Sequence, residues 1–233
     1  MRVLVTRPAI SAGRTGQRLA ALGHEPLLLP LFRAEHDAAG VALARAAKDI
    51  GSIVVTSAEA IRALGRAEEL AGTPVFAVGQ KTAKAALDAG FSAVETAGAD
   101  GAALARYLCR RFPDGTGPNL LYLTGEPRTP QLEQTLVAAR FRIMPAVCYR
   151  MQPVDIAGDE LQSLFQTAPD AVLLYSSETA RRFFDVAGSV VRQHEEMKIL
   201  CLSAAVAEAV PAEIRNPVRW AATPDEDALF ELL

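Results

Sequence analysis

Residues 145–153 read Pro145-Ala-Val-Cys-Tyr-Arg-Met-Gln-Pro153, and they interrupt an otherwise regular alternation of strand and helix patterns. Proline fixes the backbone φ angle and cannot donate a hydrogen bond to a sheet ladder, so it is tolerated at strand ends and edges. The stretch is therefore predicted to be an extended segment with Tyr149 in its middle. A similar extended segment covers residues 27–35. We predict that the two segments run together as a bridge between two domains, and that Tyr149 faces the gap.

Outward from this stretch, the chain consists of two halves that repeat one pattern. Apolar strand patterns at residues 2–6, 53–57 and 75–79 correspond to residues 120–125, 171–177 and 199–203. The offset between matching residues changes only from 118, for Thr6 and Thr124, to 125, for Leu104 and Leu229. Strands that alternate with helices at this spacing are typical of parallel sheets with helices on both faces. The predicted fold class is α/β, with two flavodoxin-like parallel-sheet lobes related by the internal repeat.

Two domain boundaries are compatible with this pattern. The Pro/Gly-rich loop 113–118 lies between the halves, and loops of this composition often join domains. The two extended segments favour another arrangement, because each follows the first strand–helix unit of its half, where the chain could cross between lobes. Lobe one would then hold residues 1–32 and 153–233, lobe two would hold residues 38–144, and residues 33–37 with 145–152 would form a two-stranded hinge. The pattern alone leaves both arrangements open.

The composition excludes several classes of protein. The formal net charge is −3, which argues against nucleic acid or an anionic membrane surface as a partner. The N-terminus begins directly with a strand pattern, and apolar runs are only strand-sized, so no signal peptide or spanning helix is expected. The three cysteines, Cys109, Cys148 and Cys201, are widely spaced and support neither a disulfide framework nor a metal site. A cytoplasmic protein is expected, and a monomer, since nothing in the sequence requires a partner chain.

Polar residues and glycine recur where the predicted strands end. In parallel sheets, ligands bind at the carboxyl ends of strands, where helix N-termini present free backbone amides. Such loops suit anionic groups, and Arg7, Lys81 and Arg128 could add positive charge. The alternative is that the serines and threonines are simply helix N-caps, each worth about 1 kcal/mol. The candidate binding residues at these strand ends are Thr6, Arg7, Thr56, Ser57, Ala58, Gly79, Lys81, Thr82, Thr124, Gly125, Ser176, Ser177 and Ser203.

Several common active-site motifs are missing from the sequence. There is no GxGxxG after the first strand, no GxxxxGK[ST] and no GxSxG, so dinucleotide binding, P-loop nucleotide binding and the hydrolase elbow lack their motifs. Tyr149 is the one side chain in an unusual position. The alternative for it is an amphipathic packing residue on a two-stranded ribbon.

These motifs, in their order, resemble the uroporphyrinogen-III synthase family. The resemblance rests on Val3-Leu-Val-Thr6-Arg7-Pro8, Ile53-Val-Val-Thr56-Ser57, Val75-Phe-Ala-Val-Gly79-Gln-Lys-Thr82-Ala83, the Tyr149 segment and Leu174-Tyr-Ser176-Ser177. It covers nearly the whole chain, although each motif alone is weakly specific. It implies two α/β lobes joined by a two-stranded β ladder, which favours the crossed arrangement over a boundary at 113–118.

The resemblance also implies an activity. The substrate would be hydroxymethylbilane, a linear tetrapyrrole with acetate and propionate arms, supplied by hydroxymethylbilane synthase. The enzyme would be a cofactor-independent lyase of heme, siroheme and cobalamin biosynthesis, closing the chain to uroporphyrinogen III in the interlobe cleft. Loss of the terminal hydroxyl gives an azafulvene, and ring D attacks to form a spiro-pyrrolenine that recloses with ring D inverted. Tyr149 matches the tyrosine that is thought to help the hydroxyl leave.

One departure from the family pattern concerns the last strand unit, where this chain has Ser203-Ala-Ala-Val206 in place of the usual hydroxyl residues. Backbone amides and Ser203 would then carry more of the binding there. Two alternatives to the enzyme remain: a non-catalytic two-lobe binding protein for a small molecule, and a degenerate synthase-like regulatory domain.

Overall fold

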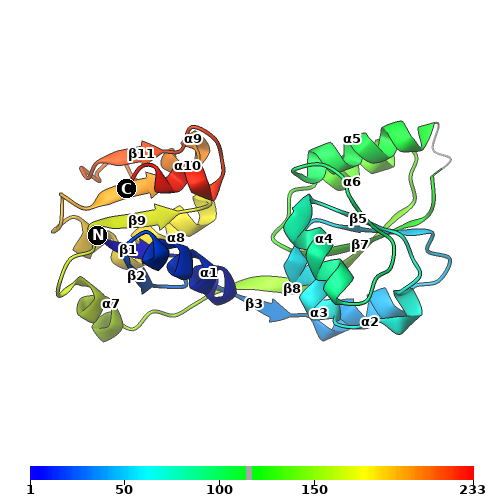
Figure 1. Cartoon of the computed structure of the whole chain (residues 1–233), viewed down its shortest axis with the longest axis horizontal. Helices are drawn as coiled ribbons and strands as arrows, with labels where there is room; N and C mark the ends of the chain where they lie inside the picture. The colour runs from blue at the N-terminus through cyan, green and yellow to red at the C-terminus, as the bar shows by residue number, and fades with distance from the viewer. Residues whose placement is uncertain (114–116) are drawn as a thin grey trace. The chain divides into compact units, whose positions relative to one another are not determined.

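The computed structural model describes residues 1–113 and 117–233 of the chain (Figure 1). Contacts within the chain divide it into two compact units. Unit 1 consists of Met1–Arg33 and Gln152–Leu233, and unit 2 consists of Ala34–Met151. The loop 113–118 was one candidate domain boundary; its residues 114–116 lie outside the described part, and the residues on either side of it belong to unit 2.

The sheet of unit 1 is parallel in all of its described pairings. Numbered along the chain within this unit, its strands have the order 2-1-3-4-5, which is the flavodoxin-like order. Helices cover both faces, as the predicted class requires. The strands in sheet order are β2 (Glu25–Leu28), β1 (Arg2–Val5), β9 (Ala171–Leu174), β10 (Lys198–Cys201) and β11 (Val218–Trp220).

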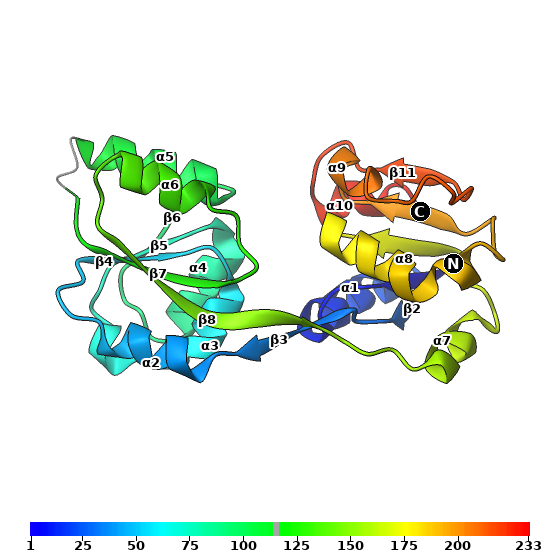
Figure 2. The same cartoon turned by 180° about the vertical axis from the view of Figure 1, so that it is seen from behind.

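The core of unit 1 lies on both faces of this sheet, because successive strand residues point to opposite sides. Val3 and Val5 pack against α1 and α10, whereas Leu4 packs against α7 and α8. Figure 1 shows α1 in front of the sheet, and Figure 2, from behind, shows α8 in front of it. The helices of unit 1 are α1 (Ala9–Ala21), α7 (Gly158–Phe165), α8 (Ser177–Val191), α9 (Ala204–Ala207) and α10 (Glu226–Phe230).

Unit 2 is built around a second sheet, whose strand order is β3-β8-β7-β4-β5-β6. The pairings between β8, β7, β4, β5 and β6 are parallel. Helices α2, α3 and α4 cover one face, and α5 and α6 cover the other. The strands are β3 (Phe32–His36), β4 (Ser52–Val55), β5 (Val75–Ala77), β6 (Val94–Thr96), β7 (Leu120–Glu126) and β8 (Ile143–Pro153). The helices are α2 (Ala38–Ala46), α3 (Ala58–Leu64), the 3-10 turn η1 (Glu68–Leu70), α4 (Gly79–Asp88), α5 (Gly101–Arg111) and α6 (Gln131–Ala138).

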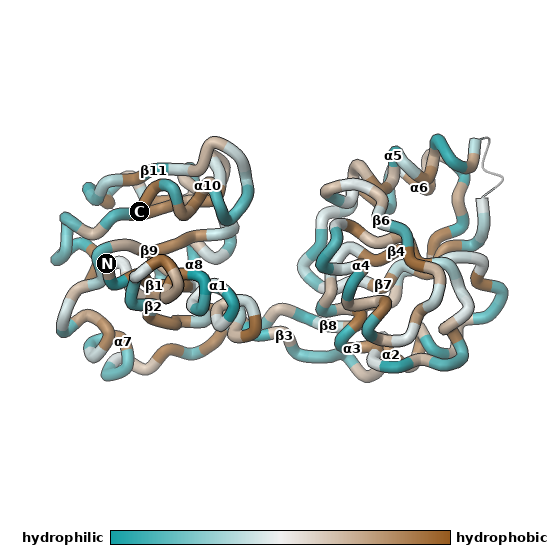
Figure 3. The backbone as a smooth tube through the Cα atoms, viewed as in Figure 1, coloured by the Kyte–Doolittle hydropathy of each residue, from teal (hydrophilic) through white to brown (hydrophobic). Residues whose placement is uncertain are grey.

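The central strands of both sheets are apolar along their length, which is visible as brown segments inside each unit in Figure 3. All four residues of β1's neighbour β9 are buried, as are all four of β4. Parallel strands covered on both faces have this continuous apolar pattern. The predicted α/β class with two parallel-sheet lobes is therefore confirmed.

Each unit combines strands from both halves of the repeat. Unit 1 joins β1 and β2 of the first half to β9, β10 and β11 of the second half. Unit 2 joins β7 and β8 of the second half to β4, β5 and β6 of the first half. The chain passes from unit 1 to unit 2 within β3 and returns within β8, which lie next to each other in the sheet order. Equivalent strand ends therefore occur once in each unit.

The extended segment predicted at residues 27–35 is two strands in two different sheets. β2 ends at Leu28 and β3 begins at Phe32. Pro30 stands between them, and it lacks the N–H that a continuous strand would need. Leu29 and Leu31 on either side are fully buried in the core of unit 1, so the break is fixed by packing.

No helix within the described residues combines the length and the apolar character that a membrane crossing requires.

Candidate active site

A pocket of about 240 Å³ opens in unit 2 at the carboxyl ends of β4 and β7. It contains five of the residues that were predicted at strand ends or on the proline-bounded segment: Thr56, Ser57, Thr124, Gly125 and Tyr149. Arg128, named from the sequence as a possible source of positive charge, also lines the pocket. The sequence pattern did not single out the other five lining residues, which are Gly101, Tyr122, Pro127, Thr129 and Leu132.

Tyr149 reaches the pocket from β8, where it pairs with Gly125 of β7 after a shift in register. A Cβ atom built on Gly125 would lie 2.2 Å from Cζ of Tyr149, so the phenol ring lies directly on the Gly125 backbone. Only glycine leaves room for the ring in this position. The ring also packs against the α2–α4 face of the core. Tyr149 is thus both a packing residue and part of the pocket wall.

The environment of Tyr149 keeps its phenol protonated. Burial raises the pKa of Tyr149 above its ordinary value, and the nearby Glu59 carboxylate adds to this. A hydrogen bond with the Ser57 side chain acts in the opposite direction, but the net direction is upward. Near neutral pH, Tyr149 is therefore a hydrogen-bond donor and a poor source of a phenolate.

Glu59, which lies on α3 near Tyr149, interacts with two basic side chains. Its carboxylate accepts from Arg62 Nη2 at 2.5 Å and lies 2.8 Å from His36 Nε2 at the end of β3. Burial alone would raise the pKa of Glu59, but the hydrogen bonds from Arg62 and His36 outweigh it, so the pKa lies below its usual value. Glu59 is therefore ionised at neutral pH.

The floor of the pocket carries hydroxyl groups. The Tyr122 hydroxyl lies 3.3 Å from Thr56 Oγ1, and Thr124 lies two residues further along β7. Tyr122 is almost fully buried within an apolar strand, so its position in the sequence does not mark it as a binding residue. Tyr122 could have been predicted from its spacing to Thr124, because residues i and i+2 lie on the same face of a strand.

Arg128 provides positive charge at the pocket, but acidic neighbours balance it. Its Nε donates to Glu133 Oε1 at 2.6 Å and its Nη1 to Glu126 Oε1 at 3.2 Å. The hydrogen bond to Glu133 and the charge of its carboxylate raise the pKa of Arg128. The pocket is thus lined by hydroxyls and one neutralised guanidinium, with no strongly basic patch among the lining residues.

Gly101 forms another part of the wall at the first residue of α5. Asp100 caps this helix by accepting from the Ala103 N–H at 2.7 Å. A Cβ atom on Gly101 would lie 3.5 Å from Leu132 of α6 and 3.9 Å from Thr56, which both line the pocket, so a side chain there has room at its base beside the pocket.

Four further predicted residues of unit 2 are not among those that line this pocket. Ala58 is buried in the first turn of α3, and Thr82 is buried on the core side of α4. Gly79 begins α4 with a φ of +68°, a conformation that favours glycine, and Lys81 is exposed two residues later.

In unit 1, the predicted hydroxyls serve the local structure. Thr6 is fully buried and donates to the Leu173 carbonyl at 2.8 Å. Ser176 caps α8 by accepting from the Thr179 N–H at 3.1 Å, and Ser177 donates to the Ala205 carbonyl at 2.8 Å. Ser203 precedes α9 and is half-buried. The capping alternative thus holds for Ser176, and in unit 2 Ser57 caps α3 while also lining the pocket.

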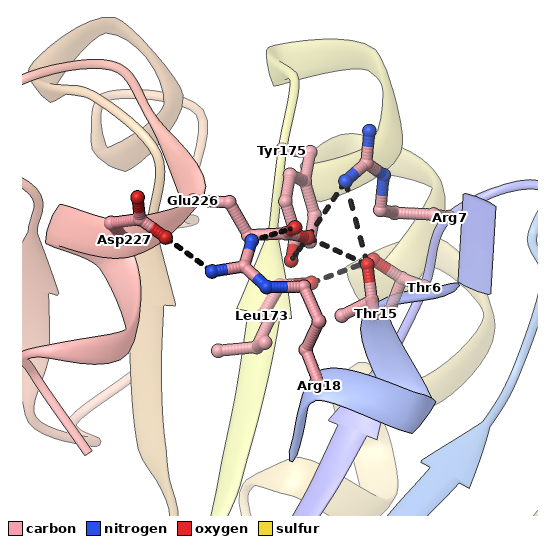
Figure 4. Close-up of polar contacts among 8 residues, drawn as sticks. All are labelled: Thr6, Arg7, Thr15, Arg18, Leu173, Tyr175, Glu226 and Asp227. Carbon is pink, nitrogen blue, oxygen red and sulfur yellow. Dashed lines mark hydrogen bonds and ion pairs between the residues drawn. The ribbon is translucent and has the colours of Figure 1, made fainter. Parts of the chain in front are cut away.

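Arg7, the remaining predicted residue, joins a polar cluster around Glu226 that sequence reasoning missed (Figure 4). Glu226 Oε1 accepts from Arg7 Nη1 at 2.8 Å, Thr15 Oγ1 at 2.6 Å and the Tyr175 hydroxyl at 2.8 Å. Its Oε2 accepts from Arg18 Nη1 at 2.6 Å. Burial alone would raise the pKa of Glu226, but these four donors outweigh it and the pKa is lowered. The partners come from the β1–α1 loop, from α1 and from the residue after β9, so no local motif indicates the cluster.

Within residues 1–113 and 117–233, the structure brings together no group of three His, Cys, Asp or Glu side chains that could hold a metal ion.

Comparison with solved structures finds this fold in other proteins. A uroporphyrinogen-III synthetase from Helicobacter pylori superimposes with a TM-score of 0.65 at 18% sequence identity, covering 100% of this chain and 98% of that one. A mutant uroporphyrinogen III synthase from Thermus thermophilus superimposes with a TM-score of 0.56 at 19% identity, covering 100% and 95%. At these identities the likeness establishes the fold. A search of curated protein sequences returned no significant match.

The family assignment comes from the sequence itself. The family model described as uroporphyrinogen-III synthase HemD matches residues 13–231, which is nearly the whole chain. The match includes the pocket of unit 2 and most of the Glu226 cluster of unit 1. This chain therefore belongs to the uroporphyrinogen-III synthase family.

Proposed function

We propose that this protein is a cofactor-independent lyase that cyclises hydroxymethylbilane to uroporphyrinogen III, with loss of water and inversion of ring D. The family assignment supports the reaction, and the observation that carries the site is the unit 2 pocket, where Tyr149, Ser57, Thr56 and Thr124 meet. The two non-catalytic alternatives have no supporting observation.

The pocket is chemically suited to a substrate with carboxylate arms and a hydroxyl leaving group. Hydroxyl side chains such as Thr56 and Ser57 can donate to carboxylates, and the helix that begins at Ala58 presents the positive end of its dipole. The pocket's volume of about 240 Å³ is below the usual range for a drug-sized ligand, so it would hold one pyrrole ring with its arms and not a whole tetrapyrrole.

Tyr149 is the residue that we assign to departure of the hydroxyl. Its raised pKa makes transfer of the whole proton unfavourable, so its role is to donate a hydrogen bond to the departing oxygen. Assistance of this kind is typically worth about 10²–10⁴-fold in rate. We expect the lower end, because the hydroxyl of hydroxymethylbilane also leaves without an enzyme.

The remaining task is to select which carbon of ring D attacks. The intermediate reacts with itself, so the protein accelerates the productive path mainly by holding the chain in the bent conformation that forms the spiro-pyrrolenine. A rigid wall formed by Tyr149 over Gly125 is suited to this. Other predicted strand-end residues, including Ser177 and Ser203 in unit 1 and Gly79 and Lys81 in unit 2, remain candidates for binding further carboxylates.

Several finer points are part of the same proposal. We propose that the two units are separate domains linked by residues 33–37 and 145–152, where the chain changes unit twice. We also propose that the protein acts as a monomer in the cytoplasm and receives its substrate from hydroxymethylbilane synthase.

The test is to give the purified protein freshly made hydroxymethylbilane without any added cofactor, oxidise the product to the porphyrin, and separate the isomers by chromatography. The type III isomer is expected. Formation of the type I isomer alone, which is the spontaneous product, would refute the enzymatic function.

A further inference from the structure

The internal repeat places an equivalent of the unit 2 pocket in unit 1. Asp225 caps α10 through the Ala228 N–H just as Asp100 caps α5 through the Ala103 N–H. Gly101 therefore corresponds to Glu226. By the same repeat, Thr124 and Gly125 correspond to Thr6 and Arg7, and Thr56 and Ser57 correspond to Tyr175 and Ser176.

The neighbouring helices agree with this correspondence. In unit 2, Gly101 of α5 faces Leu132 of α6, the helix that follows β7. In unit 1, Glu226 of α10 contacts Thr15 and Arg18 of α1, the helix that follows β1. The two helix pairs therefore pack on equivalent faces of their sheets.

Three positions that are small in unit 2 carry long polar side chains in unit 1. Gly125, Thr56 and Gly101 are replaced by Arg7, Tyr175 and Glu226. The three unit 1 residues contact one another. Glu226 accepts hydrogen bonds from Arg7 and Tyr175, and the Arg7 guanidinium stacks 4.2 Å above the centre of the Tyr175 ring. Figure 4 shows Arg7, Tyr175 and Glu226 in contact, so side chains of unit 1 stand at the positions that line the open pocket in unit 2.

The partners of Glu226 are those that a protein uses to bind a carboxylate. Two guanidinium groups and two hydroxyls donate to its two oxygens at 2.6 to 2.8 Å. The two guanidinium donors remain close to solvent, since the side chains of Arg7 and Arg18 are 26% and 45% exposed. Glu226 itself is 20% exposed, so a ligand from solution can reach its position.

We propose that Arg7, Thr15, Arg18 and Tyr175 form a carboxylate-binding site that Glu226 occupies as an internal ligand, and that an alkyl carboxylate exchanges with Glu226 there. The identity of that ligand as an acetate or propionate arm of the tetrapyrrole rests on the proposed function. The site itself does not, because it is defined by the donors around Glu226.

Three variants separate the site from its occupant. Glu226→Ala empties the site, and Glu226→Gln fills it with an uncharged side chain of the same shape. Glu231→Gln is the matched control, since it removes one negative charge from an exposed residue one turn further along. The first measurement is the thermal midpoint of each protein in sodium propionate and in sodium chloride at equal ionic strength.

Propionate is expected to raise the midpoint of Glu226→Ala by about 2–4 °C more than it raises that of the wild type or of Glu231→Gln, because a bound ligand stabilises the folded state. Glu226→Gln, whose site is still filled, should show no such gain. Equal responses of Glu226→Ala and Glu231→Gln would overturn the carboxylate site. If Glu226→Ala does not fold, Glu226→Ser, whose short side chain also leaves the site open, takes its place in the same measurement, and equal responses of Glu226→Ser and Glu231→Gln would overturn the site.

The second measurement addresses exchange, with the octacarboxylate uroporphyrin I as the fluorescent probe. Removal of an internal competitor increases the fraction of protein with a free site, so Glu226→Ala is expected to bind the probe about tenfold more tightly than the wild type. Unchanged affinity together with a positive propionate result would overturn exchange while leaving the site intact. A positive propionate result in a protein that forms no type III isomer would separate this proposal from the proposed function.

Discussion

At the scale of single residues, the position of Tyr149 depends on Gly125. The glycine is required because the Tyr149 ring occupies the place of its side chain, and the register of β7 and β8 puts the two opposite each other. The ring is therefore held between the Gly125 backbone and the core side chains on the α2–α4 face. A rigidly held donor loses little entropy when the substrate binds, which is the condition for efficient assistance to a leaving group.

Removal of the Tyr149 hydroxyl tests this role. Tyr149→Phe keeps the ring and its packing, so stability should change little while the rate of type III formation falls by about 10²-fold, the low end of general-acid effects. Tyr107→Phe, outside the pocket lining, is the control. Equal rates for wild type and Tyr149→Phe would return Tyr149 to a packing role.

At the scale of elements, α2 lies directly on β8 at Gly40. A Cβ atom on Gly40 would come within 1.7 Å of the Val147 carbonyl oxygen, so no side chain fits between helix and strand. The contact lies two residues from Tyr149 along β8. The position of the strand, and with it the position of the tyrosine, thus depends on a glycine that the sequence pattern gave no reason to notice.

Gly40→Ala should lower the free energy of unfolding by about 1–3 kcal/mol, because the backbone must move to accept the methyl group. Gly13→Ala in α1 is the matched control, since a Cβ there meets open space. That control should be stabilising by about 0.4–1 kcal/mol through its effect on the unfolded chain. Urea unfolding measures both, and a Gly40→Ala protein as stable as Gly13→Ala would show that α2 does not pack as described.

Features that depend on local sequence could be predicted, whereas features that depend on contacts between distant segments could not. The strand–helix alternation and the repeat were readable, because they follow from local apolar runs and from the similarity of two halves. The strand-end positions of Thr56, Ser57 and Thr124 followed from the same rule. The break at Pro30, the role of Gly101 and the Glu226 cluster did not, because each depends on contacts between segments that are far apart in sequence.

At the scale of the whole molecule, half-buried ion pairs make stability depend on pH. The folded-state pKa values of Glu59 and Glu226 both lie below the ordinary value of 4.5. A depressed folded-state pKa gives stability that is fully present above the unfolded value and is lost as pH falls through the folded one. The protein should therefore hold its stability down to about pH 4.5 and lose it progressively below.

Urea unfolding between pH 6 and pH 3 measures this dependence. Glu226→Gln should be less stable than the wild type at pH 6, and the difference should shrink as the pH falls, because the wild-type Glu226 becomes protonated as well. A difference that stays constant over this range would mean that Glu226 is not ionised in its cluster.

The repeat gives the whole molecule an asymmetry: the site of unit 2 is open where that of unit 1 is filled, and Gly101 marks the difference. Gly101→Glu would copy the filled state into unit 2, because a side chain there has room at its base and begins beside the lining residues Leu132 and Thr56. Gly72→Glu adds the same side chain at an exposed position of unit 2 with open space around it, and serves as the control.

The isomer ratio formed from hydroxymethylbilane by these two variants and the wild type tests the central claim most directly. The wild type and Gly72→Glu are predicted to yield the type III isomer. Gly101→Glu is predicted to yield mainly type I at the spontaneous rate, because its pocket is blocked. Formation of type III by Gly101→Glu at the wild-type rate would contradict the assignment of this pocket as the active site.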